Sequence, residues 1–246
     1  LQRFRARLAA EPGIRLRAVA TQSLREARNG ADIAAQASLA LGHPVEVIDG
    51  QEEARLAWLG VASLQPGHRR RLVMDVGGRS SELVLGHGAR LERAFSLPVG
   101  SVSLSRRHFA EGCFSASAFE AATAAAQAAV APTALALGAW PRWEEALGSS
   151  GTVSAVSRVL GANGMAGPDG AVTLGALAWC RQQCEAAGEA QALHLAGLEQ
   201  DRRPVMGGSI ALLTGLFQAL GLEAVRPARG ALRNGVIFDL AQHPAA

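Results

Sequence analysis

The chain has 246 residues, of which 49% are hydrophobic, and this is enough for one large domain or two smaller ones. Its formal net charge is only +3, with arginine in place of every lysine, so nucleic-acid binding is not predicted. Cysteines at positions 113, 180 and 184 form neither a disulfide framework nor a zinc motif. No signal peptide or apolar run of transmembrane length is evident, so we expect a cytoplasmic protein with no membrane partner.

The first part of the chain is predicted to alternate helices and strands. The opening LQRFRARLAA is typical of the end of an amphipathic helix, and residues from Ile14 alternate apolar and polar side chains as a strand does. A helix then ends at Gly42, and Val45–Ile48 is a second strand. Asp49 with Glu52 forms a capping-box pattern for a nearly all-apolar, buried helix. This order implies a parallel sheet with a helical crossover.

Pro66 and Gly67 mark the predicted boundary between a partial first lobe, residues 1–65, and a second lobe, residues 66–246. The segments LVMDV, SSELVLG and RLERAFSLPV then predict an antiparallel meander. A helix over residues 116–137 follows, which we expect Pro132 to interrupt. The remaining expected elements are a strand at ALGSSGT, helices ending at 160 and covering 174–187 and 209–220, a strand at EAVRPA, and a closing helix at GALRNGVIFDLA that packs back toward the first lobe.

The segment MDVGGRSSEL places a carboxylate, two glycines and two hydroxyls at the end of an apolar strand. Gly77 and Gly78 let backbone N–H groups approach an anion, Ser80 adds a hydroxyl donor, and Asp75 is placed to hold Mg²⁺ through water. A phosphate with its metal ion explains the pattern, and so does an ordinary tight hairpin. A second loop, GSSGT, precedes a helix whose first amides either face an anion or are capped by a hydroxyl.

Two charged residues outside these loops are candidates for chemistry. Glu53 shares a helix stripe with Ala57 and Gly60, so burial is expected to raise the pKa of its carboxyl group toward the range of a general base. The alternative is that Glu53 only complements the helix dipole. Arg25, just past a strand end, is either a bidentate partner for phosphate or a solvated surface residue.

Six segments, taken together and in this order, resemble the signature blocks of the exopolyphosphatase/guanosine pentaphosphate phosphohydrolase family: RAVATQSLREARNG, VEVIDGQEEARLAWLGV, LVMDVGGRSSELVLG, SLPVGSVSLSRRHF, GSSGTVSAV and GALRNGVIFDL. The resemblance covers nearly the whole chain. It implies an α/β fold with two ribonuclease-H-like lobes of the actin-like ATPase type and a cleft between them. It also implies Mg²⁺-dependent removal of the terminal phosphate of inorganic polyphosphate or of the 5′ γ-phosphate of guanosine pentaphosphate.

The same resemblance implies roles for individual residues. Glu53 matches the family's base, which activates the attacking water, and Asp75 and Glu82 match acids associated with the metal ion. Arg25 matches an arginine that contacts phosphate. The loops that hold phosphate match at five further positions: Gly77, Gly78, Ser80, Gly151 and Thr152.

Several features depart from the family pattern. Arg79 stands where the family usually has a glycine, Asn234 where it has a glutamate, and Pro204 where it has an acid. The family's opening glycine–hydroxyl loop has no counterpart, so we expect a fragment whose first lobe is incomplete and exposes apolar surface.

These departures keep a second function open beside the phosphohydrolase. In this alternative, the chain is a degenerate family member that binds polyphosphate or an alarmone nucleotide without cleaving it. An actin-like ATPase or sugar kinase fits the lobes but not the GQEEAR segment. A homodimer is the default oligomer.

Overall fold

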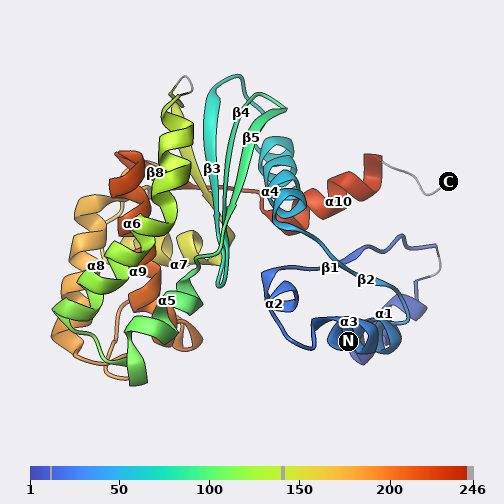
Figure 1. Cartoon of the computed structure of the whole chain (residues 1–246), viewed down its shortest axis with the longest axis horizontal. Helices are drawn as coiled ribbons and strands as arrows, with labels where there is room; N and C mark the ends of the chain where they lie inside the picture. The colour runs from blue at the N-terminus through green and yellow to red at the C-terminus, as the bar shows by residue number, and fades with distance from the viewer. Residues whose placement is uncertain (12, 140–141, 243–246) are drawn as a thin grey trace.

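The computed structural model describes residues 1–11, 13–139 and 142–242 (Figure 1). The central element is a six-stranded sheet with the strand order β5-β4-β3-β6-β8-β7, and β1 and β2 form a separate parallel pair. The strands are β1 (Ala18–Ala20), β2 (Val45–Val47), β3 (Arg70–Val76), β4 (Ser81–His87), β5 (Arg90–Leu97), β6 (Glu145–Ser149), β7 (Val172–Thr173) and β8 (Ala224–Pro227). The α-helices are α1 (Gln2–Ala9), α2 (Gln22–Arg25), α3 (Gly30–Leu41), α4 (Gly50–Leu64), α5 (Ser101–His108), α6 (Ala116–Gly138), α7 (Ser150–Ala162), α8 (Leu174–Ala187), α9 (Met206–Leu220) and α10 (Leu232–Gln242).

Residues 1–48, which we call the N-terminal unit, lie at one side of the central sheet (Figure 1). Strands β1 and β2 pair in parallel and are joined through α3, as the predicted crossover requires. The prediction of a strand that begins at Ile14 is wrong in length, because only residues 18–20 pair with β2. The expected exposed apolar side chains are present in this unit, and Phe4 and Leu39 are 64% and 77% exposed.

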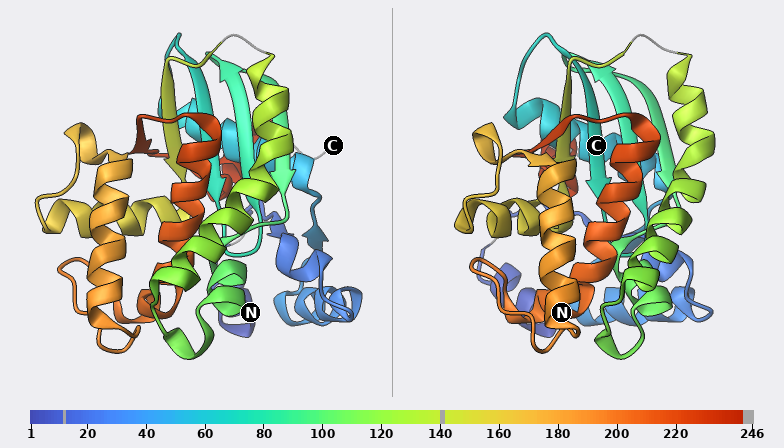
Figure 2. Two further views of the ribbon diagram at one scale, coloured as in Figure 1. Left: turned by 60° about the vertical axis from the view of Figure 1, so that its left-hand side comes forward. Right: turned by 90° about the vertical axis from the view of Figure 1, so that its left-hand side faces the viewer.

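The central sheet packs on both faces because successive residues of a strand point to opposite sides. Leu72 and Met74 of β3 contribute to the large core that includes α6, α8 and α9. Val73, between them, belongs instead to a smaller core with Trp58 and Val61 of α4. The sheet therefore lies between α4 and the group of helices on the other face (Figures 1 and 2).

Helix α6 corrects two sequence-based expectations. Pro132 lies inside α6 without ending it, because both Pro132 and Ala128, four residues before it, are solvent-exposed and water can replace the missing hydrogen bond. By length and composition α6 is also apolar enough to span a membrane, so the expectation that no run reaches that length is wrong. The core helix of a folded domain can have the same length and composition. Helix α6 lies beside α9 over the sheet (Figure 2), and Gly215 of α9 leaves room there for Ala126.

Helices α4 and α10 pack at backbone distance. A Cβ added at Gly60 would lie 2.2 Å from the carbonyl oxygen of Ala231, and one added at Gly235 would lie 1.8 Å from that of Leu56. Helix α4 is thus held between the central sheet and α10. The predicted division at residues 65 and 66 stays a prediction, although α4, which it assigns to the first lobe, packs on the sheet of the second.

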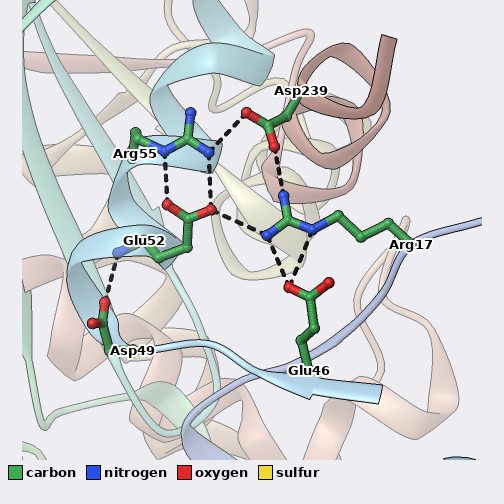
Figure 3. A network of polar contacts seen from close by, with 6 residues as sticks. All are labelled: Arg17, Glu46, Asp49, Glu52, Arg55 and Asp239. Carbon is green, nitrogen blue, oxygen red and sulfur yellow. Dashed lines mark hydrogen bonds and ion pairs between the residues drawn. The ribbon is translucent and has the colours of Figure 1, made fainter. Parts of the chain in front are cut away.

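An ion-pair network joins the N-terminal unit to α4 and α10 (Figure 3). Arg17, just before β1, donates to Asp239 of α10 at 2.6 Å and to Glu46 of β2 at 3.0 Å. Arg55 of α4 donates to Asp239 at 2.8 Å and to Glu52 at 2.7 Å. The carboxylate of Asp239 therefore bridges two arginines from different parts of the chain.

Candidate functional site

Two acids are placed by the strand period at the ends of β3 and β4. Val73 and Val84 pack toward α4, so Asp75 and Glu82, two residues away on each strand, lie on the same face. The two acids are also directly opposite each other in the β3–β4 register. Glu53, in the first turn of α4, borders the same hollow as both of them. Three carboxyl groups from α4, β3 and β4 thus meet at one end of the sheet.

These three carboxyl groups are buried and influence one another's charge. Glu53, Asp75 and Glu82 are 7%, 7% and 1% exposed. Burial, with a smaller contribution from the charge of Glu53, raises the pKa of Asp75 to about 6. Burial and then the charges of Glu53 and Asp75 raise the pKa of Glu82 to about 8. Among the described residues, Asp75 and Glu82 form no ion pair with a basic side chain, so a bound cation would lower the electrostatic cost of ionising them.

The Glu53 carboxyl group is oriented by Arg25. Burial raises the pKa of Glu53, and the guanidinium of Arg25, 2.9 Å away, acts against this shift. Arg25 also donates to the carbonyl oxygen of Ile48 at 2.6 Å and to the side chain of Gln22. These contacts occupy the donors of Arg25, and Arg25 lines neither of the two cavities described below. The Arg25 guanidinium therefore contacts Glu53 and does not face an open cavity.

The larger cavity, of about 710 Å³, is bordered by Glu53, Asp75 and Glu82 at one end. Its wall also includes Gly77 and Gly151. Four arginines that sequence reasoning did not single out line it: Arg158, Arg202, Arg229 and Arg233. Among the described residues, only Arg158 of these four forms an ion pair, with Glu199 at 2.9 Å. The cavity thus has acids at one end and uncompensated cations along its wall.

The smaller cavity, of about 300 Å³, adjoins the larger one at Glu53 and Gly77, which line both cavities. Gly78 and Ser80 line it, as do Arg79 and Arg106. Glu53 and the start of the glycine loop therefore border both hollows.

Most of the sequence-predicted site residues come together, with two exceptions. Glu53, Asp75, Gly77, Gly78, Ser80, Glu82 and Gly151 line one or both cavities. Arg25 lies behind Glu53, as described. Thr152 is buried one turn into α7, where its hydroxyl contacts that of Ser101 at 3.3 Å. Thr152 therefore supports α5 and does not line either cavity.

Ser150 is a site residue that sequence reasoning missed. Its φ of 84° lies in the left-handed region that residues other than glycine rarely adopt. Its hydroxyl donates to the carbonyl oxygen of Val76 at 2.6 Å, which joins the first residue of α7 to the end of β3. Arg158 of α7 could have been identified from the sequence as a site residue. Ser150, Ser154 and Arg158 recur every four residues and so share one helix face.

Asp75 and Glu82 are the described residues most suited to a metal ion. No three His, Cys, Asp or Glu side chains within the described ranges are grouped so as to hold a metal by themselves. Mg²⁺ is commonly held by one or two carboxylates, with water and phosphate oxygens completing its shell. Ser149 pairs with Asp75 in the β3–β6 register, and its buried hydroxyl has no partner among the described residues. These donors fit a Mg²⁺ ion that is shared with a phosphate ligand.

Comparison with known proteins gives a consistent result. A family model described as the Ppx/GppA phosphatase family matches residues 1–243. The crystal structure of the Aquifex aeolicus member of the Ppx/GppA family is 21% identical, with a TM-score of 0.78, and the match covers 100% of this chain and 80% of that one. An exopolyphosphatase from Cytophaga hutchinsonii is 20% identical, with a TM-score of 0.82 and coverages of 98% and 79%. The expected α/β fold class is confirmed by these matches.

Proposed function

Because the chain belongs to the Ppx/GppA phosphatase family, we propose that it hydrolyses terminal phosphoanhydride bonds, with a water molecule as nucleophile. The observation that carries this proposal is the position of Glu53, a buried carboxyl group with a raised pKa between two cavities that both offer arginines. Phosphoryl transfer to water requires a positioned nucleophile and neutralisation of phosphate charge. Glu53 is suited to the first task and the arginines to the second.

Arg25 supports the role of Glu53 as a general base. A base must be ionised before it accepts a proton, yet its pKa must not be too low. Burial raises the pKa of Glu53 and the Arg25 guanidinium opposes the rise, so the pKa is raised less than burial alone would raise it. Hydrogen bonds from Arg25 and from the Thr21 side chain also fix the orientation of the carboxylate.

We place Mg²⁺ at Asp75 and Glu82. A bound Mg²⁺ ion would supply positive charge to phosphate oxygens. The two carboxyl groups are opposite each other in the β3–β4 register, and burial, followed by the charges of neighbouring acids, raises the pKa of each. We therefore expect hydrolysis to stop when a chelator removes the metal.

Inorganic polyphosphate is the substrate that the larger cavity favours. Four arginines line it, and arginine suits phosphate because its planar guanidinium donates two hydrogen bonds at once. No aromatic side chain is among the described residues of this wall, so a nucleotide base would have to stack on an arginine that would otherwise pair with phosphate. We expect turnover of polyphosphate to exceed that of guanosine pentaphosphate.

Replacing Glu53 tests the proposed function. We expect Glu53→Gln to lower phosphate release from both substrates by about 10²- to 10⁴-fold, because the base is lost while the hydrogen bond with Arg25 can remain. Release is measured in the presence of Mg²⁺, and binding of the uncleaved substrate is measured by calorimetry. Binding should change little.

Glu52→Gln is the matched control, because Glu52 is the neighbouring acid but pairs with Arg55 and Arg17 outside the cavities. Equal phosphate release by the wild type and Glu53→Gln would remove Glu53 from the role of base. Tight polyphosphate binding by the wild type with no release would instead support the non-hydrolytic alternative, which Arg79 and Pro204 favour.

A further inference from the structure

A third cavity, of about 500 Å³, lies at the other end of the central sheet from the proposed active site, and we call it the distal cavity. It is formed where α6 and α9 end and where β6 and β8 begin (Figure 1). Glu145 in its wall begins β6, whereas Ser149, which ends β6, is opposite Asp75 of the proposed active site. No described residue lines both the distal cavity and either of the other two. Its volume is that of a site for a small molecule.

One part of the distal cavity is apolar and is bordered by a fixed guanidinium group. The apolar residues of the wall include Trp143, Leu222, Pro168 and Ala171. Trp143 is half-buried and packs against the large core. The guanidinium of Arg142 lies 5.2 Å from the centroid of the Trp143 ring and donates to the carbonyl oxygen of Gly221 at 2.7 Å. An apolar ligand group can therefore pack beside a positive charge whose position is set by the chain.

Some charges in this wall neutralise one another. Glu145 accepts from Arg226, which also lines the cavity, and from Arg71 of β3. Arg226 also pairs with Asp169 at 3.6 Å. These side chains find their partners within the chain, so they do not require a ligand.

Four other charged side chains of the wall are not neutralised in this way: Arg69, Arg142, Glu144 and Glu223. Within the described ranges none of them forms an ion pair, either with one another or with a further side chain. Two positive and two negative charges thus border one hollow and remain apart. A ligand with one anionic and one cationic group would pair with both signs. A polyanion would be repelled by the carboxylates, and a polycation by the guanidinium groups.

We propose that the distal cavity binds a free amino acid with an apolar side chain, in its zwitterionic form. The ligand carboxylate pairs with Arg69 and Arg142, the ammonium group pairs with Glu144 and Glu223, and the ligand side chain packs against Trp143. The ligand has no net charge, and the four unpaired side chains of the wall have none either. Binding here is independent of the proposed hydrolysis, since the two sites share no described residue.

Titration of the full chain by calorimetry with leucine and with phenylalanine tests the proposal. Two analogues of leucine separate the charges, because 4-methylpentanoate lacks the ammonium group and 3-methylbutylamine lacks the carboxylate. Both amino acids should bind, and leucine should bind at least about tenfold more tightly than either analogue, since each analogue loses charged hydrogen bonds. The absence of binding by both amino acids at about 10 mM would overturn the proposal. An analogue that binds as tightly as leucine would overturn it too.

Two substitutions test the residues that the proposal names. Arg69→Gln and Glu223→Gln should each weaken leucine binding about three- to tenfold. Arg69→Gln should not weaken binding of 3-methylbutylamine, which has no carboxylate, and Glu223→Gln should not weaken binding of 4-methylpentanoate, which has no ammonium group. Both side chains are exposed, and thermal unfolding of each variant verifies that it is folded.

Arg90→Gln and Glu120→Gln are the matched controls, because both residues are exposed and neither is among the described residues that line the three cavities. Their leucine affinities should equal that of the wild type. Equal losses in Arg69→Gln and Arg90→Gln would show that binding follows the net charge of the chain, and this would overturn the assignment to the distal cavity. Leucine affinity that neither Arg69→Gln nor Glu223→Gln changes would also overturn it.

Discussion

Glu82 shows how one buried side chain carries a pH dependence. Its pKa of about 8 in the folded chain exceeds the ordinary value of about 4.3. Between these values the folded state binds more protons than the unfolded state, so the free energy of unfolding falls as the pH rises. The stabilising effect of the protonated Glu82 is complete below about pH 4 and is lost as the pH passes about 8.

Glu82→Gln should therefore flatten the pH dependence of stability. The amide stays neutral, so the variant should lose less stability than the wild type between pH 5 and pH 8, by a difference on the order of 2 kcal/mol. The measurement is urea unfolding with a chelator present, so that no cation pairs with the acids. Glu120→Gln, at an exposed position of α6, should leave the wild-type slope unchanged. A parallel decline for wild type and Glu82→Gln would contradict the assigned burial effect.

For single residues, sequence patterns predicted burial better than they predicted contacts. The helix stripe of Glu53 with Ala57 and Gly60 predicted burial, because helical spacing is a local property, and Glu53 is indeed 7% exposed. The contacts of Arg25 could not be foreseen. They depend on Gln22, Ile48 and Glu53 being brought together by α2, β2 and α4.

At the scale of elements, close packing of α4 and α10 depends on glycines. We expect Gly235→Ala to destabilise the fold by at least about 1–3 kcal/mol, because a Cβ there would lie 1.8 Å from the carbonyl oxygen of Leu56. This loss should outweigh the better helix propensity of alanine, which is about 1 kcal/mol. Chemical denaturation of the two proteins measures the difference.

Gly161→Ala in α7 is the comparison, because a Cβ at Gly161 has no neighbour within 4 Å. There the helix propensity acts alone, so the variant should be as stable as the wild type or more stable by up to about 1 kcal/mol. A stable Gly235→Ala protein would mean that α10 can move away from α4 without cost.

Elements that form through local patterns were predicted best. The capping of α4 by Asp49, whose side chain accepts from the Glu52 amide at 2.8 Å, and the β3–β4–β5 meander both follow from neighbouring residues. Strand β1 was predicted too long because strand length depends on the partner. Pro132 did not end α6 because solvent exposure, a tertiary property, relieves the lost hydrogen bond.

At the scale of the whole molecule, Asp239 holds the N-terminal unit in place. Its carboxylate accepts from Arg17 and Arg55, and its side chain is 12% exposed (Figure 3). We expect Asp239→Asn to destabilise the chain by about 1–3 kcal/mol, since two arginines lose their shared carboxylate. Hydrogen exchange should become faster in residues 14–48 and stay slow in the central sheet.

Glu120→Gln again provides the control, because Glu120 forms a 3.7 Å pair with Arg181 and is 72% exposed. Its loss should change the free energy of unfolding by at most about 0.5 kcal/mol. Uniformly faster exchange over the whole chain in Asp239→Asn would show that the network stabilises the fold globally and does not fix the N-terminal unit in particular.

The sequence by itself determined the α/β class, most element positions and the acids and glycines that gather at the site. The elements follow from periodicity, capping and turn chemistry, which act over a few residues. The site roles of Glu82 and Gly151 followed only from the resemblance to the family. Only the tertiary structure decided that Arg158, Arg202, Arg229 and Arg233 line one cavity with Glu53, and that Arg79 and Arg106 line another. The physical reason is that a charge acts through space, so its neighbours depend on how α4, α5, α7 and the residues before α9 and α10 pack around the central sheet.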